Sequence, residues 1–228
     1  AEGGRRIVIV DSADEMNTAA ANALLKVLEE PPKDAVLFLV SHRPARLLPT
    51  IRSRCRELRL GPLDADALAK AVVAAGGVAD GVALAELSGG SAGEALRLAA
   101  LDGQGIYSAL IDLFSGAPRM DRQKAAAIAE KAAQRGAVER LDLTLQLVDV
   151  ALARLARTGA GVAAGREATS GEAEMLSRLS PDLRKAHIWA DLHRNLGDRL
   201  ARGRAVNIDP AALLLDAFLR INEAAGQP

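Results

Sequence analysis

Two short apolar runs stand near the start of the chain, and a segment with helical periodicity separates them. Ile7–Val10 and Ala35–Val40 are uncharged and rich in β-branched and aliphatic residues. Such runs are typical of strands that are buried on both faces of a parallel sheet. Between them, leucines at helical spacing predict a helix from about Thr18 to Glu30. The order strand, helix, strand predicts a right-handed βαβ crossover.

Local signals mark the ends of this helix. Asn17 or Thr18 can cap its first turn, and Pro31-Pro32 ends it. The segment Ser12–Glu15 also fits a capping box, but it lies further from the apolar stripe.

After Ser41 the chain becomes basic. Between Ser41 and Leu60 the chain contains one acidic residue, Glu57, and six arginines: Arg43, Arg46, Arg52, Arg54, Arg56 and Arg59. Pro49 suits the first turn of a short helix. Leu58 and Leu60 alternate with charged residues, which predicts one more half-buried strand before Gly61-Pro62 breaks the pattern.

Beyond Pro62 the pattern is helical throughout. Asp64 is expected to cap a helix that stops at Gly76-Gly77, and a second helix is expected from about Asp80 to Ser88. Ser91 and Glu94 form a capping box for a third helix, which should end near Leu101.

The remaining residues predict four or five longer helices after a joint at Gly103 and Gly105. A loop rich in Gly and Ala, Thr158–Gly171, separates two of them. Ser180-Pro181 and Asp209-Pro210 each combine a capping residue with proline, which predicts two helix starts.

The predicted elements therefore form three zones. Residues 1–61 hold a piece of an α/β sheet, residues 62–103 a small three-helix unit, and residues 104–228 a larger helical bundle. The fold class is α/β plus all-α. Because two or three parallel strands do not make a stable open sheet alone, and because "AEGGRR" precedes the first strand without Met, we expect an N-terminal half to be missing.

Composition narrows the function classes. Lys plus Arg and Asp plus Glu each number 29, so no global field attracts nucleic acid. The single cysteine, Cys55, excludes an internal disulfide framework and a multi-cysteine zinc site, and it fits a reducing cytosol. No apolar stretch predicts a membrane span or a signal peptide. His187 and His193 lie six residues apart, a spacing that does not predict a metal pair.

Two positions could carry chemistry. Asp11 follows the first buried strand, at the sheet edge where ligands bind in open α/β sheets, although a strand-terminal Asp can equally cap a turn. Arg54 follows the second strand on a short helix, and its guanidinium matches phosphate oxygens. Composition alone favours the other interpretation, that the six arginines form a solvated face.

"NALLKVLEEPP" (Asn22–Pro32) followed by "LPTIRSRC" (Leu48–Cys55) resembles the clamp-loader branch of the AAA+ proteins, which serves bacterial DNA polymerase III. The resemblance covers about residues 5–101 and continues more loosely, as helical content, to the end. It implies a partial P-loop AAA+ sheet domain, a lid of three helices, and a helical collar that holds subunits together, for the three zones in turn.

The resemblance also assigns site residues. Asp11 falls on the Walker B aspartate, and Ser12 replaces the acid that polarises water in the motor subunits. Ser41 falls near sensor 1, and Gly93 falls on the position of the arginine that touches nucleotide in motor subunits. These departures imply a subunit that hydrolyses no ATP, with no nucleotide or metal bound by this chain.

Within Ser53-Arg54-Cys55, the resemblance implies that Arg54 acts in trans, on ATP and Mg²⁺ in a neighbouring subunit, while Cys55 packs rather than reacts. The implied partners are the gamma/tau motor subunits, the delta subunit, the sliding clamp and, through the complex, primed DNA. The implied function is cytoplasmic clamp loading within the DNA-directed DNA polymerase III holoenzyme. Two alternatives stay open: an ATP-hydrolysing motor subunit of the same loader, and a purely structural helical interaction domain.

Overall fold

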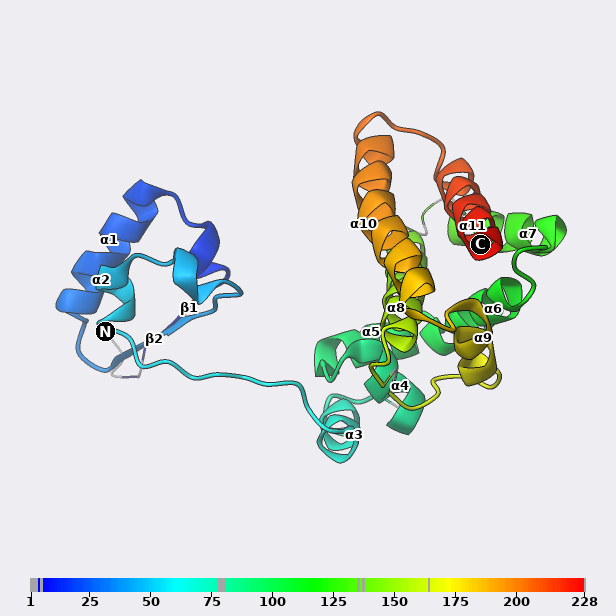
Figure 1. The fold of residues 1–228 in the computed structure, drawn as a ribbon. Coiled ribbons are helices and arrows are strands. Elements are labelled where there is room, and N and C mark those ends of the chain that lie inside the picture. Colours follow the sequence, from blue (N-terminus) through cyan, green and yellow to red (C-terminus); the bar gives the residue numbers. More distant parts are fainter. Residues whose placement is uncertain are drawn as a thin grey trace. The chain divides into compact units, whose positions relative to one another are not determined.

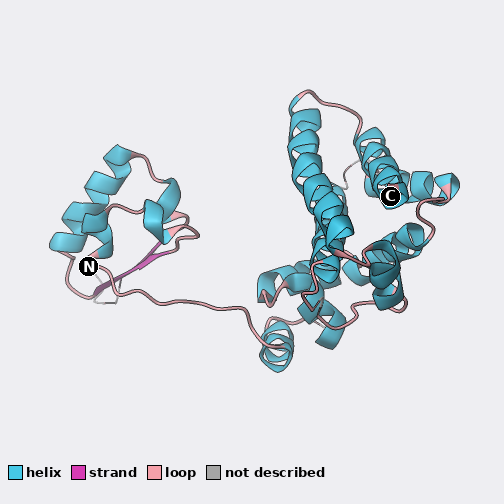
Figure 2. Cartoon of the chain, viewed as in Figure 1, coloured by secondary structure: helices cyan, strands magenta, loops and turns pink. Residues whose placement is uncertain are grey.

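The chain forms two compact units, residues 1–61 and residues 62–228 (Figures 1 and 2). They are seen in a computed structural model that describes residue 4 and residues 6–77, 81–134, 136, 138–163 and 165–227. The unit boundary lies at Gly61-Pro62. The assignment of 62–103 as a lid and 104–228 as a collar stays a prediction.

The first unit contains a parallel pair of strands, as the sequence predicts. Strand β1 spans Arg6–Val10 and strand β2 spans Ala35–Leu39, with Ile7 opposite Val36 and Ile9 opposite Phe38. The backbone N–H of Val40 still donates to the carbonyl of Val10 (3.0 Å), so the pairing continues to the end of the predicted second run.

Helix α1 begins and ends near the predicted signals, and α2 begins at Pro49 as predicted. Helix α1 spans Thr18–Glu29, and the Oδ1 atom of Asn17 accepts a hydrogen bond from the backbone N–H of Ala20 (2.9 Å). Asn17 is therefore the cap. The shorter elements are η1 (Ala13–Glu15), η2 (Pro44–Arg46) and α2 (Pro49–Arg52).

The strands are not buried on both faces, so that prediction is wrong for this chain. Ile7, Ile9 and Phe38 share one face and are 64%, 66% and 53% exposed. Leu37 and Leu39, on the other face, are half-buried. Both helices lie on one side of the sheet (Figure 1), and among the described residues nothing covers the other side.

The predicted third strand is also wrong. Residues 56–64 have no regular secondary structure, and Leu58 and Leu60 are 79% and 87% exposed. Alternation of apolar and charged residues produces a strand only where a neighbouring strand takes up its backbone hydrogen bonds. In the described part of the chain, this segment has no such neighbour.

The second unit is helical (Figure 2). Its helices are α3 (Ala65–Ala74), α4 (Gly81–Ser88), α5 (Ala92–Ala100), α6 (Gly103–Ser115), α7 (Arg122–Ala132), α8 (Val138–Gly159), α9 (Glu172–Leu179), α10 (Leu183–Ala205) and α11 (Pro210–Gly226). Five of the last six have 11 residues or more, as predicted. None of the helices that the structure describes is long and apolar enough to cross a bilayer.

Three predicted caps in this unit are confirmed. The side chains of Asp64, Ser91 and Asp209 accept hydrogen bonds from backbone N–H groups in the first turns of α3, α5 and α11, at 2.8, 3.3 and 2.9 Å. The expected start at Asp80 lies outside the described residues.

Two predicted boundaries are wrong. Gly103 and Gly105 lie inside the first turn of α6, and the break falls at Asp102, whose φ is 58°. Ser180 does not cap α10, because it ends α9 and is buried. Asp182 caps α10 instead, since its Oδ1 atom accepts from the backbone N–H of Lys185 (2.9 Å).

A single apolar core joins the helices of the second unit. Trp189 on α10 is fully buried, and its indole N–H donates to the carbonyl of Leu179 (3.0 Å). Phe114 on α6 meets Phe218 on α11 edge to face, with ring centroids 6.2 Å apart. Helices α8 and α10 cross this core side by side (Figure 1).

A buried polar cluster lies within the same unit. The Nε atom of Arg154 on α8 lies 2.7 Å from Oε1 of Glu172 on α9, with the two side chains 7% and 0% exposed. The hydroxyl of Tyr107 donates to the same Oε1 (2.5 Å), and the backbone N–H of Ala168 donates to Oε2 (2.7 Å). Hydrogen bonds to several partners offset the desolvation of Glu172.

Candidate functional site

Arg54 lies two residues beyond the last residue of helix α2, which is fixed in the first unit by one buried side chain. Ile51 is 1% exposed and anchors the helix. The Ser53 hydroxyl and the Nη1 atom of Arg54 both donate to the carbonyl of Thr50, at 3.1 and 3.0 Å. This carbonyl is one of those that a helix end leaves without a backbone partner. The segment Ser53-Arg54 therefore closes the end of α2.

The guanidinium of Arg54 is held at a second point. Its Nη2 atom lies 2.7 Å from Oε1 of Glu29, the last residue of α1, with side-chain exposures of 37% and 51%. A guanidinium has five N–H donors, so these two contacts leave others available to a further anion. All six arginines of the basic stretch are exposed, but Arg54 is attached to both helices.

Cys55 follows Arg54 and is half-buried. Burial raises the pKa of its thiol above the ordinary value. The nucleophilic thiolate is therefore suppressed at neutral pH. This agrees with the interpretation of Cys55 as a packing residue.

Asp11 and Ser12 lie at the carboxyl end of β1. The Ser12 hydroxyl donates to Oδ1 of Asp11 (3.1 Å), and Asp11 is exposed. The Asp11 carboxylate can bind a cation there, whereas a serine hydroxyl does not accept a proton from water at neutral pH. The pair therefore offers one anionic ligand and no general base.

The ends of the two strands are tied together beside Asp11. The backbone N–H of Ala13 donates to the carbonyl of Val40 (2.8 Å), and that of His42 donates to Oδ1 of Asp14 (3.1 Å). Burial alone would raise the pKa of Asp14, but backbone hydrogen bonds from Asp14 and His42 outweigh it and lower that pKa. Ser41, with a buried hydroxyl oxygen, belongs to this edge.

The sequence did not indicate the part that Asp14 plays in holding this edge. Its carboxylate contacts a residue 28 positions away in the chain, and no local pattern encodes that contact. Asp11 and Ser12 follow β1 and Ser41 follows the paired strand β2, so the structure brings these three residues to one edge of the sheet.

Gly93 belongs to the second unit. It lies in the first turn of α5, and a Cβ atom added there would meet no atom within 4 Å. A side chain at this position would therefore extend into open space. Glycine offers none, so no side-chain cation at this position can reach a phosphate.

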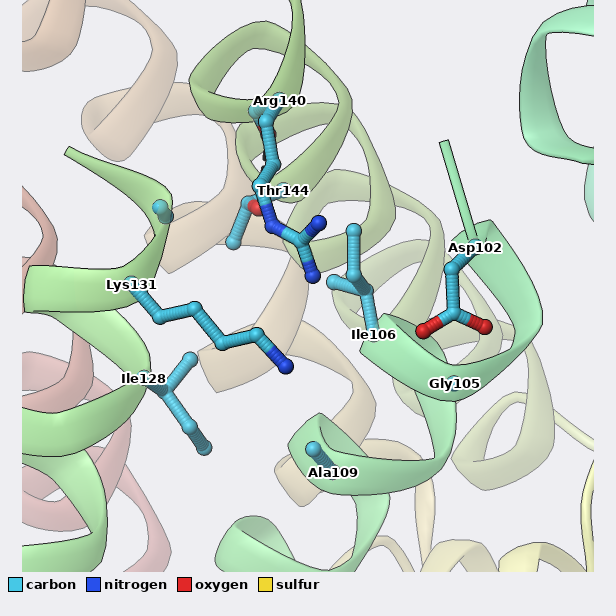
Figure 3. Close-up of a pocket in the computed structure, with 9 residues that line it drawn as sticks. Asp102, Gly105, Ile106, Ala109, Ile128, Lys131, Arg140 and Thr144 are labelled. Carbon is cyan, nitrogen blue, oxygen red and sulfur yellow. Dashed lines mark hydrogen bonds between the residues drawn. The ribbon is translucent and has the colours of Figure 1, made fainter. Parts of the chain in front are cut away.

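The second unit also has a small pocket of about 100 Å³ between α6, α7 and α8. Lys131 and Arg140 extend into it from two helices, with Asp102 at its far side (Figure 3). Pockets for drug-sized ligands usually measure about 300–1,000 Å³. This one is too small for a nucleotide.

A second hollow, of about 310 Å³, is apolar. It lies between α8 and the turn from α10 to α11, and its walls are formed by Leu141, Leu145, Asn207, Ile208, Pro210 and Leu213. Without titratable side chains in its walls, the hollow offers no catalytic group.

Of the two histidines noted in the sequence, His193 meets a carboxylate on a neighbouring helix. The Nε2 atom of His193 lies 2.7 Å from Oδ1 of Asp149, which ties α10 to α8. Over the residues that the structure covers, no three His, Cys, Asp or Glu side chains come together as metal ligands.

Known proteins match the first unit closely. Residues 1–64 match the family described as DNA polymerase III, delta subunit. The DNA polymerase III subunit delta′ of Pseudomonas aeruginosa is 64% identical over 53 residues, which are 23% of this chain and 16% of that protein. The subunit delta′ of Bacillus subtilis is 43% identical over 72 residues, 32% of this chain and 22% of that protein.

A subunit of a second kind is also similar to part of this chain. DNA polymerase III subunit gamma/tau of Mycobacterium bovis is 49% identical over 49 residues, 22% of this chain and 8% of that protein. The matches thus span less than a quarter of each relative's length. The N-terminal part of the chain, which holds Asp11, Glu29 and Arg54, is therefore similar to the delta prime subunits of bacterial DNA polymerase III.

Proposed function

We propose that this chain acts as a non-hydrolysing subunit of a DNA polymerase III clamp loader and presents Arg54 to ATP in a neighbouring subunit. The placement of Arg54 carries the proposal. Its guanidinium is held at the end of α2 by the Thr50 carbonyl, and its side chain is 37% exposed. Further N–H donors of the guanidinium are available to bind an anion. An arginine supplied in trans stabilises the charge that develops during phosphoryl transfer. In GTPases such an arginine raises kcat by a factor of about 10³–10⁵.

The absence of hydrolysis by the chain itself is argued from Ser12. Asp11 could help hold Mg²⁺ with ATP, but the next residue supplies a hydroxyl that donates to Asp11 instead of a carboxylate. A neutral hydroxyl does not orient and deprotonate water as a carboxylate does. Gly93 in turn supplies no cation for the phosphates. The chain would therefore serve its neighbour's site and not a site of its own.

The proposed partners follow from the relatives. In this view the chain assembles with gamma/tau and delta subunits, engages the sliding clamp, and reaches primed DNA through the complex in the cytoplasm. The helical second unit would join the collar that holds the subunits together, since its core is built from long helices packed around Trp189.

ATP turnover by the assembled loader tests the proposal. We would compare loaders that contain the wild-type chain, Arg54→Ala and, as a matched control, Arg52→Ala, with clamp and primed DNA present. Arg52 is an exposed arginine at the end of the same short helix. We expect Arg54→Ala to lower turnover about fivefold or more, Arg52→Ala to leave it unchanged, and the chain alone to be inactive.

Different outcomes favour the other two functions. Turnover by the chain alone would favour a motor subunit, for which the similarity to gamma/tau is the supporting observation. A loader that assembles with Arg54→Ala and keeps its full turnover would favour a structural interaction domain.

A further inference from the structure

We infer that Glu29 is the positioning residue for Arg54, and this inference rests on the proposed function of Arg54. Two sequence motifs carry the similarity to clamp loaders: Asn22–Pro32 includes the end of α1, and Leu48–Cys55 includes α2 and Arg54. The Glu29–Arg54 ion pair, with 2.7 Å between Nη2 and Oε1, joins these motifs across 25 positions of the chain. The pair thus links the two most specific parts of the sequence.

The position of Glu29 does not suit its own helix. It is the last residue of α1, where the partial negative charge of the helix end disfavours an acid and favours a cation. The guanidinium of Arg54 supplies that cation. The end of helix α1 and the Glu29 carboxylate therefore both attract the Arg54 guanidinium. The presence of an acid at position 29 follows from its contact with Arg54, since it does not stabilise the helix.

Two fixed points determine the direction of the guanidinium. Nη1 donates to the Thr50 carbonyl at 3.0 Å, and Nη2 meets Glu29 at 2.7 Å. One contact alone would leave the flexible side chain free to turn about it. With both contacts, the remaining N–H donors keep one orientation, so little conformational freedom is lost when an anion binds.

This contact contributes little to folding, because both side chains are substantially exposed, at 37% and 51%. Removing it should therefore leave the first unit folded. What changes is how often the guanidinium is correctly placed, and misplacement of a positioning group lowers the catalytic rate more than it lowers substrate binding.

Kinetics of the assembled loader test this role. The variants are Glu29→Ala, Glu29→Gln, Arg54→Ala, the double variant Glu29→Ala/Arg54→Ala, and Glu30→Ala as control. Glu30 is also exposed and directly follows the last residue of the same helix, and among the described residues its side chain makes no ion pair or hydrogen bond. Gel filtration and thermal melting confirm assembly and folding of each.

We expect Glu29→Ala to lower kcat for clamp- and DNA-stimulated ATP turnover about two- to threefold, with KM for ATP unchanged. Glu29→Gln, which keeps the Oε1 acceptor, should recover part of this loss. The double variant should be no worse than Arg54→Ala, because a positioning residue has no effect without its partner.

The outcomes separate this inference from the proposed function. If Arg54→Ala lowers turnover while Glu29→Ala matches Glu30→Ala, Glu29 does not position Arg54 and only this inference falls. If Glu29→Ala raises turnover, the ion pair restrains Arg54 and the inference is overturned. If Arg54→Ala itself changes nothing, the proposed function falls and the inference with it.

Discussion

The two units use apolar residues in opposite ways. In the first, Ile7, Ile9 and Phe38 lie on a sheet face that is more than half exposed. In the second, Phe114 and Phe218 are 0% and 1% exposed and pack on each other. Both regions carry strongly apolar segments, so their difference lies in what surrounds those segments and not in composition.

This difference shows what an apolar run does and does not encode. A run such as Ile7–Val10 indicates a strand that is suited to burial. In a two-stranded sheet with helices on one side, however, Ile7, Val8 and Ile9 stay 64%, 46% and 66% exposed. The apolar face of an amphipathic helix such as α8 packs against other helices of the same unit. The helical unit is therefore self-sufficient in its core, and the sheet unit is not.

We expect the largest change in the free energy of unfolding when one phenylalanine in each unit is truncated and the two units are compared. Phe218→Ala should lower the free energy of unfolding of the second unit by about 3–5 kcal/mol, since it opens a cavity beside Phe114. Urea denaturation followed by the fluorescence of Trp189, the single tryptophan, measures this.

Phe38→Ala is the matched change in the first unit. Because Phe38 is 53% exposed, we expect a loss of about 1 kcal/mol or less, measured by hydrogen exchange of residues 6–39. A cost equal to that of Phe218→Ala would mean that Phe38 is covered in solution, and the contrast between the units would disappear.

An effect of intermediate size on the free energy of unfolding is expected when the pH is raised far enough to ionise tyrosine. Burial, and then the Glu172 carboxylate, raise the pKa of Tyr107 above its ordinary value. Below a pH of about 10 the phenol keeps its proton in the folded and in the unfolded chain. Tyr107 therefore does not make the free energy of unfolding depend on pH in that range. Above that, only the unfolded chain releases the proton, so the free energy of unfolding should fall by about 1.4 kcal/mol per pH unit.

Tyr107 is the single tyrosine, so tyrosinate absorbance reports its ionisation directly. We expect the absorbance to rise only together with unfolding, and Tyr107→Phe to remove this part of the alkaline pH dependence. Ionisation near pH 10 while Trp189 still reports a folded unit would contradict the buried cluster.

The smallest effect concerns two glycines that begin helices of the second unit. Gly93→Ala should raise the free energy of unfolding by about 0.5–1 kcal/mol, because the added Cβ meets nothing within 4 Å. Gly103→Ala should lower it, since a Cβ there would lie 2.5 Å from Cδ2 of Leu98. Equal effects of the two changes, in the same urea titrations, would show that room for a side chain does not distinguish these positions.

Local features of the fold were predictable because their causes lie within a few residues. The caps Asn17, Asp64, Ser91 and Asp209 each bond to an N–H group three residues ahead, so sequence spacing alone indicates them. Predictions failed where a local pattern needed a distant partner. Leu58 and Leu60 alternate as a strand would, but in the described residues no strand lies beside them.

The same distinction applies to the candidate site. The residue types and order of Asp11, Ser12 and Arg54 were readable from the chain, and so was the position of Asp11 at a strand end. The contact between Arg54 and Glu29 was not, because it depends on how α2 packs near the end of α1.

The sequence by itself determined helix α1, four of the helix caps, the parallel strand pair and the motifs that make the chain similar to DNA polymerase III subunits. These follow from periodicity and short-range hydrogen bonding, which act between neighbours in the chain. Tertiary structure alone decided which apolar residues are covered, which carboxylate holds Arg54, and that Tyr107, Arg154 and Glu172 share one buried cluster. Those contacts join residues 18 to 65 positions apart, and their formation depends on packing, which no local pattern specifies.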